Sequence, residues 1–108
     1  MAKAEVYNNE ELAGILEKKA SDHYVFTYTE AYFKNADKKA ISLSFPKTEQ
    51  RFEAKVLFPF FYGLLSEGIN KDIQCRLLKI DEDDDFTRLI KTAGEDTIGA
   101  ITVKEIND

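Results

Sequence analysis

The sequence predicts a single α+β domain over residues 1–108, in which a small curled antiparallel sheet or partial β-barrel is capped by about three short helices. Three observations predict this class. In the first half of the chain, and again near its end, apolar residues recur at every second position, as in half-buried strands. Between residues 56 and 94 they recur at helical spacing. The chain length suits one domain with one modest core.

The first predicted element is a hairpin over residues 5–18. Its turn is Asn8-Asn9, because asparagine tolerates the positive φ that a tight turn needs. After the turn, Leu12, Gly14 and Leu16 occupy alternate positions, and we expect them to share one face of a strand.

The clearest strand pattern covers His23 to Thr29, after a polar stretch at 18–22 that predicts a loop. Tyr24, Phe26 and Tyr28 alternate with smaller residues and are expected to face the core. The next residues, 30–35, fit a short turn of helix followed by a charged loop.

A further strand is predicted over residues 40–45, where apolar residues alternate with serines until a proline ends the pattern. Ile41, Leu43 and Phe45 are expected to form its buried face. The polar segment 47–55 predicts a loop with a short strand near Phe52.

Three helices and a last strand complete the prediction. The first helix begins at Pro59, which suits a first helical turn, and stops at Gly68. The second is capped by Asn70, and the third by Asp84 or Asp85. Their predicted buried stripes are Ile69, Ile73, Leu77 and Ile80, then Phe86, Leu89, Ile90 and Ala93. Gly94 ends the third helix, and Ile101 and Val103 mark the final strand.

The composition excludes several classes of function. The net charge of −5 disfavours direct nucleic-acid binding, because phosphate neutralisation needs clustered Lys and Arg. A single cysteine forms no internal disulfide, whereas small secreted domains usually need several, which predicts a cytoplasmic protein. No signal peptide is recognisable, and the longest apolar run, 56–65, is shorter than the ~20 residues that span a membrane.

No group of residues makes a convincing catalytic or metal site. The acidic run 81–85 lacks the Gly and Glu that a calcium loop requires at its sixth and twelfth positions, so we interpret it as a helix cap. Cys75 has no typical nucleophile context, and a small enzyme using Cys75 with His23 is a weaker alternative. The prediction is therefore no catalytic residue, no metal and no cofactor.

The crowded aromatic block Phe58-Pro59-Phe60-Phe61-Tyr62 is the most informative segment. Successive helical residues are turned by about 100°, so Phe60, Phe61 and Tyr62 do not all fit one buried stripe. One interpretation makes Phe60 and Phe61 core residues and Tyr62 a rim residue. The other places an aromatic side chain, with Tyr62 as the best candidate, on an apolar patch made for a partner.

Five blocks, in order from Val6 to Val103, match a known pattern. They are Val6-Tyr7-Asn8-Asn9 with Gly14-Ile15-Leu16, Tyr24-Val25-Phe26-Thr27-Tyr28 with Tyr32, Ile41-Ser42-Leu43-Ser44-Phe45-Pro46, Phe60 to Gly68, and Asp85-Phe86 with Gly94 to Ala100. The chain thereby resembles the N-terminal domain of HipA-type serine/threonine kinases, the toxins of bacterial HipBA toxin–antitoxin systems. Gly63 and Ser66 depart from the Asn and Pro of that pattern, so the side-chain contacts of that Asn and Pro do not carry over to this chain.

The resemblance implies a non-catalytic subunit that binds a separate HipA-like kinase chain lacking this domain and regulates it as an antitoxin. In three-protein versions of the system, a helix-turn-helix protein binds the DNA. The alternative is a structural subunit that completes a split kinase without inhibiting it. The expected partner-binding residues are Phe58, Phe61, Tyr62, Ser66 and Glu67.

Overall fold

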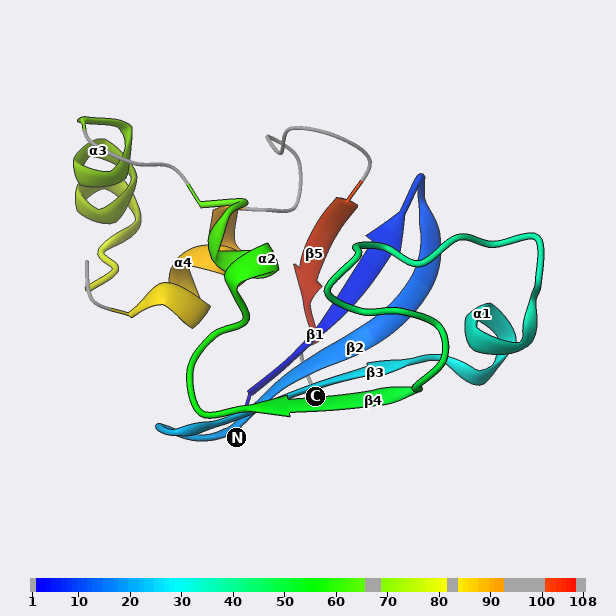
Figure 1. Ribbon diagram of the computed structural model, residues 1–108. Coiled ribbons are helices and arrows are strands. Elements are labelled where there is room, and N and C mark those ends of the chain that lie inside the picture. Colours follow the sequence, from blue (N-terminus) through cyan, green and yellow to red (C-terminus); the bar gives the residue numbers. More distant parts are fainter. Residues whose placement is uncertain (1, 66–68, 82–83, 93–100, 107–108) are drawn as a thin grey trace.

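The computed structural model describes residues 2–65, 69–81, 84–92 and 101–106. Their elements are β1 (Ala2–Asn8), β2 (Glu11–Ala20), β3 (His23–Tyr28), α1 (Glu30–Lys34), β4 (Arg51–Ala54), α2 (Pro59–Tyr62), α3 (Ile69–Leu78), α4 (Asp85–Thr92) and β5 (Ile101–Glu105). The strands form one antiparallel sheet in the order β4-β3-β2-β1-β5 (Figure 1). The α+β class is confirmed, and the sheet is open, with β4 and β5 at its edges.

The hairpin β1–β2 forms, but its turn consists of Asn9 and Glu10 and not of Asn8-Asn9, because Asn8 still pairs with Glu11. The hairpin also contains a bulge that changes which side chains face the core. Val6 pairs with Gly14 whereas Tyr7 pairs with Leu12, so Ala13 is an extra residue on β2. Directly paired residues share a face, so Leu12 lies with Tyr7 on the face opposite Val6. The expectation that Leu12 shares the face of Gly14 and Leu16 is wrong for this reason.

The polar segment 18–20 belongs to β2 and not to a loop, which corrects the prediction. Lys18 pairs with Tyr24 and Ala20 with His23, and the Lys18 Nζ lies 5.8 Å from the centre of the Tyr24 ring. Pairing with β3 therefore outweighs the polar character of these residues. The turn itself contains only Ser21 and Asp22.

Residues 40–45 form turns and bends and no strand, which overturns a second prediction. The Tyr28 hydroxyl donates to the Phe45 carbonyl oxygen at 2.5 Å and accepts from the Ile41 amide at 3.1 Å. Because a side chain binds these backbone groups, they do not join the sheet. Phe45 is buried as expected, whereas Leu43 is fully exposed.

The core lies between one face of the sheet, α2, α4 and the segment that joins α1 to β4 (Figure 1). Phe26 is near its centre, with its ring centroid 4.8 Å from that of Phe45 and 5.7 Å from that of Phe61. The helix α4 adds Phe86 and Leu89 to this core, and both are buried as predicted. In β5, Ile101 and Val103 are buried as predicted, which confirms the closing strand.

The stripe predicted to be buried on α3 is wrong at Ile73 and Leu77. Both are exposed, whereas Cys75 of the same helix is buried. Asn70 lies inside α3, which begins at Ile69, so it is not the cap. Gly68, Ala93 and Gly94 lie outside the described residues. No helix in the described part of the chain is long and apolar enough to cross a membrane.

Candidate functional site

The short helix α2 carries the candidate site and begins where the sequence predicts. Pro59 occupies its first turn, and the Phe58 carbonyl oxygen accepts from the Tyr62 amide at 3.0 Å. Gly63 continues the turn with helical φ and ψ and donates to the Pro59 carbonyl oxygen at 2.9 Å. These bonds fix the directions in which the aromatic side chains leave the backbone.

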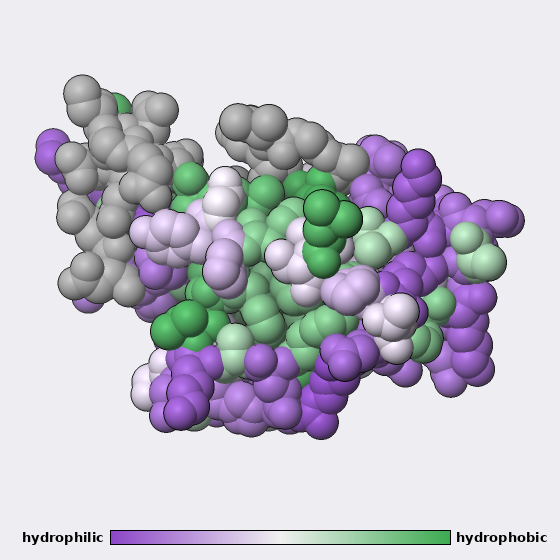
Figure 2. Space-filling model, in the orientation of Figure 1, coloured by the Kyte–Doolittle hydropathy of each residue, from purple (hydrophilic) through white to green (hydrophobic). Residues whose placement is uncertain are grey.

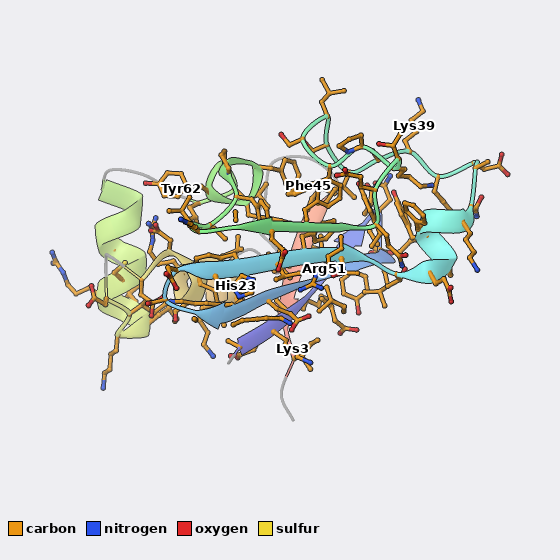
Figure 3. The ribbon with its side chains drawn as sticks, turned by 60° about the horizontal axis from the view of Figure 1, so that its bottom comes forward. Lys3, His23, Lys39, Phe45, Arg51 and Tyr62 are labelled. Atoms are coloured by element: carbon orange, nitrogen blue, oxygen red, sulfur yellow. The ribbon has the colours of Figure 1, made fainter. Side chains whose placement is uncertain are left out.

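The structure separates the predicted contact residues into buried and exposed ones. Phe61 is completely buried and Phe58 is 8% exposed, so both side chains face the core. Their predicted part in partner contact is therefore an indirect one, from within the core. Tyr62 is 42% exposed (Figure 3). Ser66 and Glu67 lie outside the described residues. Partner contact at Tyr62 therefore stays a prediction, with an exposed side chain available for it.

An aromatic cluster holds α2 against the rest of the domain. The Phe45 ring centroid lies 5.1 Å from that of Phe58, 5.9 Å from Phe60 and 5.6 Å from Phe61, with edge or tilted geometry. Phe60 is only partly buried. The segment before β4 thus packs directly against α2.

Two further exposed apolar residues belong to the segments that meet at this cluster, and sequence reasoning missed both. Leu43 lies two residues before Phe45, and Val56, which is 67% exposed, lies two residues before Phe58. Figure 2 shows a hydrophobic area on one face of the molecule, with hydrophilic borders below and to the right. Alternation made Leu43 look buried, and no pattern in the sequence could have shown that it is exposed.

A hollow of about 340 Å³ opens beside Val56. Its apolar wall includes Tyr24 and Leu57, and its other lining residues include Lys18, Lys55, Asp81, Asp84 and Asp85. Two of these carboxylates, those of Asp84 and Asp85, have hydrogen-bond partners within α4. Asp84 Oδ1 accepts from the Thr87 amide at 3.1 Å, which confirms the predicted cap of the third helix.

The two residues of the enzyme alternative lie on different elements. His23, at the start of β3, bonds through Nε2 to Glu53 Oε1 at 2.9 Å, and this bond holds the pKa of Glu53 below its ordinary value of 4.5. Cys75 is buried on α3. No hydrogen bond joins the pair in the part of the chain that the structure describes. Within those same residues, no group of three or more His, Cys, Asp or Glu is placed to hold a metal ion.

Comparisons with known proteins agree on one family. Its sequence model, described as the HipA N-terminal domain, matches residues 4–104. A solved structure described as the N-terminal domain of HipA toxin superposes with a TM-score of 0.71 at 28% identity, covering 100% of this chain and 95% of that one. A protein of Haemophilus influenzae described as uncharacterized is 38% identical over 65 residues, 60% of each chain. This domain is the part of HipA distinct from its kinase domain, and the chain belongs to the HipA N-terminal domain family.

Proposed function

We propose that the domain is a non-catalytic subunit that binds a separate HipA-type serine/threonine kinase chain and regulates it as an antitoxin. Family membership supports a HipA-related role. The observation that carries the proposal further is the half-exposed Tyr62, which follows the buried Phe61 on α2 and whose amide donates to the Phe58 carbonyl oxygen at 3.0 Å. Aromatic residues on rigid supports are typical anchors of protein interfaces, because little side-chain entropy is lost on binding.

The contact is expected to use the exposed side of α2. Tyr62 offers a ring for burial and a hydroxyl for a hydrogen bond, a combination enriched at interfaces. Binding there would either occupy the active-site region of the kinase or hold its two lobes in an inactive arrangement. DNA binding is assigned to a separate helix-turn-helix protein, in keeping with the acidic net charge of this chain.

Copurification with a HipA-type kinase chain lacking its own N-terminal domain, taken from the same genome, tests binding directly. We expect a stable complex with the unmodified chain. Tyr62→Ala should weaken it by roughly 10-fold or more, or about 1.4 kcal/mol, without unfolding the domain. Tyr62→Phe is the matched control, since it keeps the ring and should retain most of the affinity. Full binding by Tyr62→Ala would disprove this site.

Coexpression separates the antitoxin role from the structural alternative. Under the proposal, the domain restores growth to cells that are poisoned by the kinase chain, and Tyr62→Ala restores it less well. A structural subunit of a split kinase would leave growth impaired, or impair it further, because it would complete the active enzyme.

A further inference from the structure

The loop of residues 35–50, between α1 and β4, carries the most exposed large apolar side chain among the described residues. Leu43 has a relative exposure of 101%. It occupies the second position of a tight turn, in which the Phe45 amide donates to the Ser42 carbonyl oxygen at 3.1 Å. Ser42 Oγ also accepts from the Ser44 amide at 3.1 Å. We call this segment the Leu43 loop.

The base of the Leu43 loop is fixed by side chains from the sheet, from α1 and from the loop itself. Besides the two bonds to the Tyr28 hydroxyl, the Tyr32 hydroxyl donates to the Lys39 carbonyl oxygen at 2.6 Å. Lys47 Nζ donates to the carbonyl oxygens of Asn35 at 2.6 Å and Lys38 at 2.7 Å. A loop held by so many bonds presents Leu43 in a fixed position, so little conformational entropy remains to be lost on binding.

One lysine of the Leu43 loop carries a charge that no described residue neutralises. Residues 34–50 contain four lysines, Lys34, Lys38, Lys39 and Lys47, and two acidic residues, Asp37 and Glu49. Lys34 pairs with Glu30, and Lys38 with Glu11. The Lys39 ammonium forms no hydrogen bond or ion pair with any described residue, and it is exposed (Figure 3). Lys39 is therefore available to pair with a carboxylate of a partner.

The Leu43 loop packs against the helix that carries Tyr62. Phe45 of the loop contacts Phe60 of α2 edge to face, with centroids 5.9 Å apart. Tyr62, Phe45 and Lys39 lie on the same side of the sheet (Figure 3). A partner that covers Tyr62 therefore approaches the side of the sheet that carries the Leu43 loop.

We propose that Leu43 is a preformed anchor that inserts into an apolar pocket on the kinase chain, and that carboxylates beside this pocket face Lys39. This inference rests on the proposed function and adds a second contact to it. A second copy of this chain is the less suitable occupant, because two chains of −5 repel each other.

Affinity measurements with the same kinase chain, by calorimetry or surface plasmon resonance, test the anchor. Leu43→Ser should weaken binding by roughly 30-fold, as at other interface hot spots. Lys39→Glu should slow association, and this effect should shrink as salt is added. Leu77→Ser is the matched control, because Leu77 is also exposed but lies on α3. It should bind like the unmodified chain.

The outcomes separate this inference from the proposed function. If the unmodified chain does not bind the kinase chain, both ideas fail. If it binds and Leu43→Ser binds equally well, only the anchor is wrong. Because Leu43 is exposed, Leu43→Ser should keep the original melting temperature, so a weakened complex is not explained by misfolding. A dimer of this chain that Leu43→Ser abolishes, seen by light scattering, would make the second copy the occupant and overturn the proposal.

Discussion

Gly14 on β2 lies against the ring of Phe26 on β3, so closely that no side chain fits at position 14. A Cβ atom built there would be 2.6 Å from Cε1 and Cζ of Phe26 and 2.6 Å from the Thr27 carbonyl oxygen. The Phe26 ring is completely buried and contacts both Phe45 and Phe61. The absence of a side chain at Gly14 thus lets this ring support the cluster beneath α2.

Gly14→Ala should therefore destabilise the domain, by about 1–3 kcal/mol, as expected for overpacking of a well-packed core. Urea denaturation measures the change. Gly63→Ala is the matched control, since its Cβ would meet only backbone oxygens at 3.4 and 3.5 Å and its φ is −64°. That variant should be neutral or slightly more stable. Equal stability of the two variants would contradict the packing argument.

Removal of the Tyr28 hydroxyl should loosen the Leu43 loop. Tyr28→Phe leaves the Phe45 carbonyl and the Ile41 amide without their partner, which costs about 1–3 kcal/mol where such groups are buried. Hydrogen exchange should show faster exchange of the Ile41 amide. Tyr62→Phe removes an equivalent hydroxyl from an exposed ring and should leave stability unchanged. Unaltered exchange at Ile41 in Tyr28→Phe would show that the phenol does not hold the loop.

The parts of the fold that sequence predicted correctly are those in which one face of a regular element meets the core. The strand from His23 and the helix from Asp85 are examples, because their apolar spacing agrees with their packing. The stripe of Ile73 and Leu77 shows the limit of this reasoning. Periodicity identifies an apolar helix face, but it does not reveal whether anything covers that face.

The remaining errors come from contacts between distant residues. The alternation in 40–45 fits a strand, yet the Tyr28 hydroxyl, distant in sequence, takes the backbone groups that a strand would use. For the candidate site, helix geometry alone indicated that Phe60, Phe61 and Tyr62 do not share one buried stripe. Burial of Phe58 was not predictable, because it precedes the helix and depends on the path of the connecting segment.

The β1–β2 turn contains a strained residue that substitution should relieve. Asn9 and Glu10 have φ values of 51° and 69°, so both lie in the left-handed region. Asparagine tolerates this region, but glutamate is rarely found there. Glu10→Gly should raise the free energy of unfolding by up to about 1 kcal/mol, as judged from chemical denaturation. Glu49→Gly, at an exposed site with ordinary φ, should bring no gain, and a similar gain there would contradict the strain argument.

The cap of α4 gives a local test of the acidic run. Asp84 accepts from the Thr87 amide at 3.1 Å and from the Thr87 hydroxyl at 2.7 Å. Asp84→Ala should lower the free energy of unfolding by about 1 kcal/mol, whereas Asp84→Asn should lower it less, since asparagine also caps helices well. Thermal or urea denaturation distinguishes the two. An equal loss in both variants would point to the charge of Asp84 and not to its cap.

The pairing of His23 with Glu53 predicts how protonation affects the edge of the sheet. The hydrogen bond from His23 is the largest cause of the lowered pKa of Glu53, and the charge of Arg51, whose Nη2 is 3.1 Å from Glu53 Oε1, is the next. A carboxyl group whose pKa is lower in the folded state stabilises that state above its unfolded pKa, near 4.5. This contribution is lost as the pH falls through the folded pKa.

His23→Ala should therefore raise the pKa of Glu53 towards 4.5, and Arg51→Gln should raise it by a smaller amount. A pH titration of the Glu53 side-chain carboxyl by NMR measures both shifts. Because Glu53 is exposed, added salt should weaken the effect of Arg51 more than that of the direct hydrogen bond from His23. If Arg51→Gln produced the larger shift, the charge of Arg51 and not the bond from His23 would control this group.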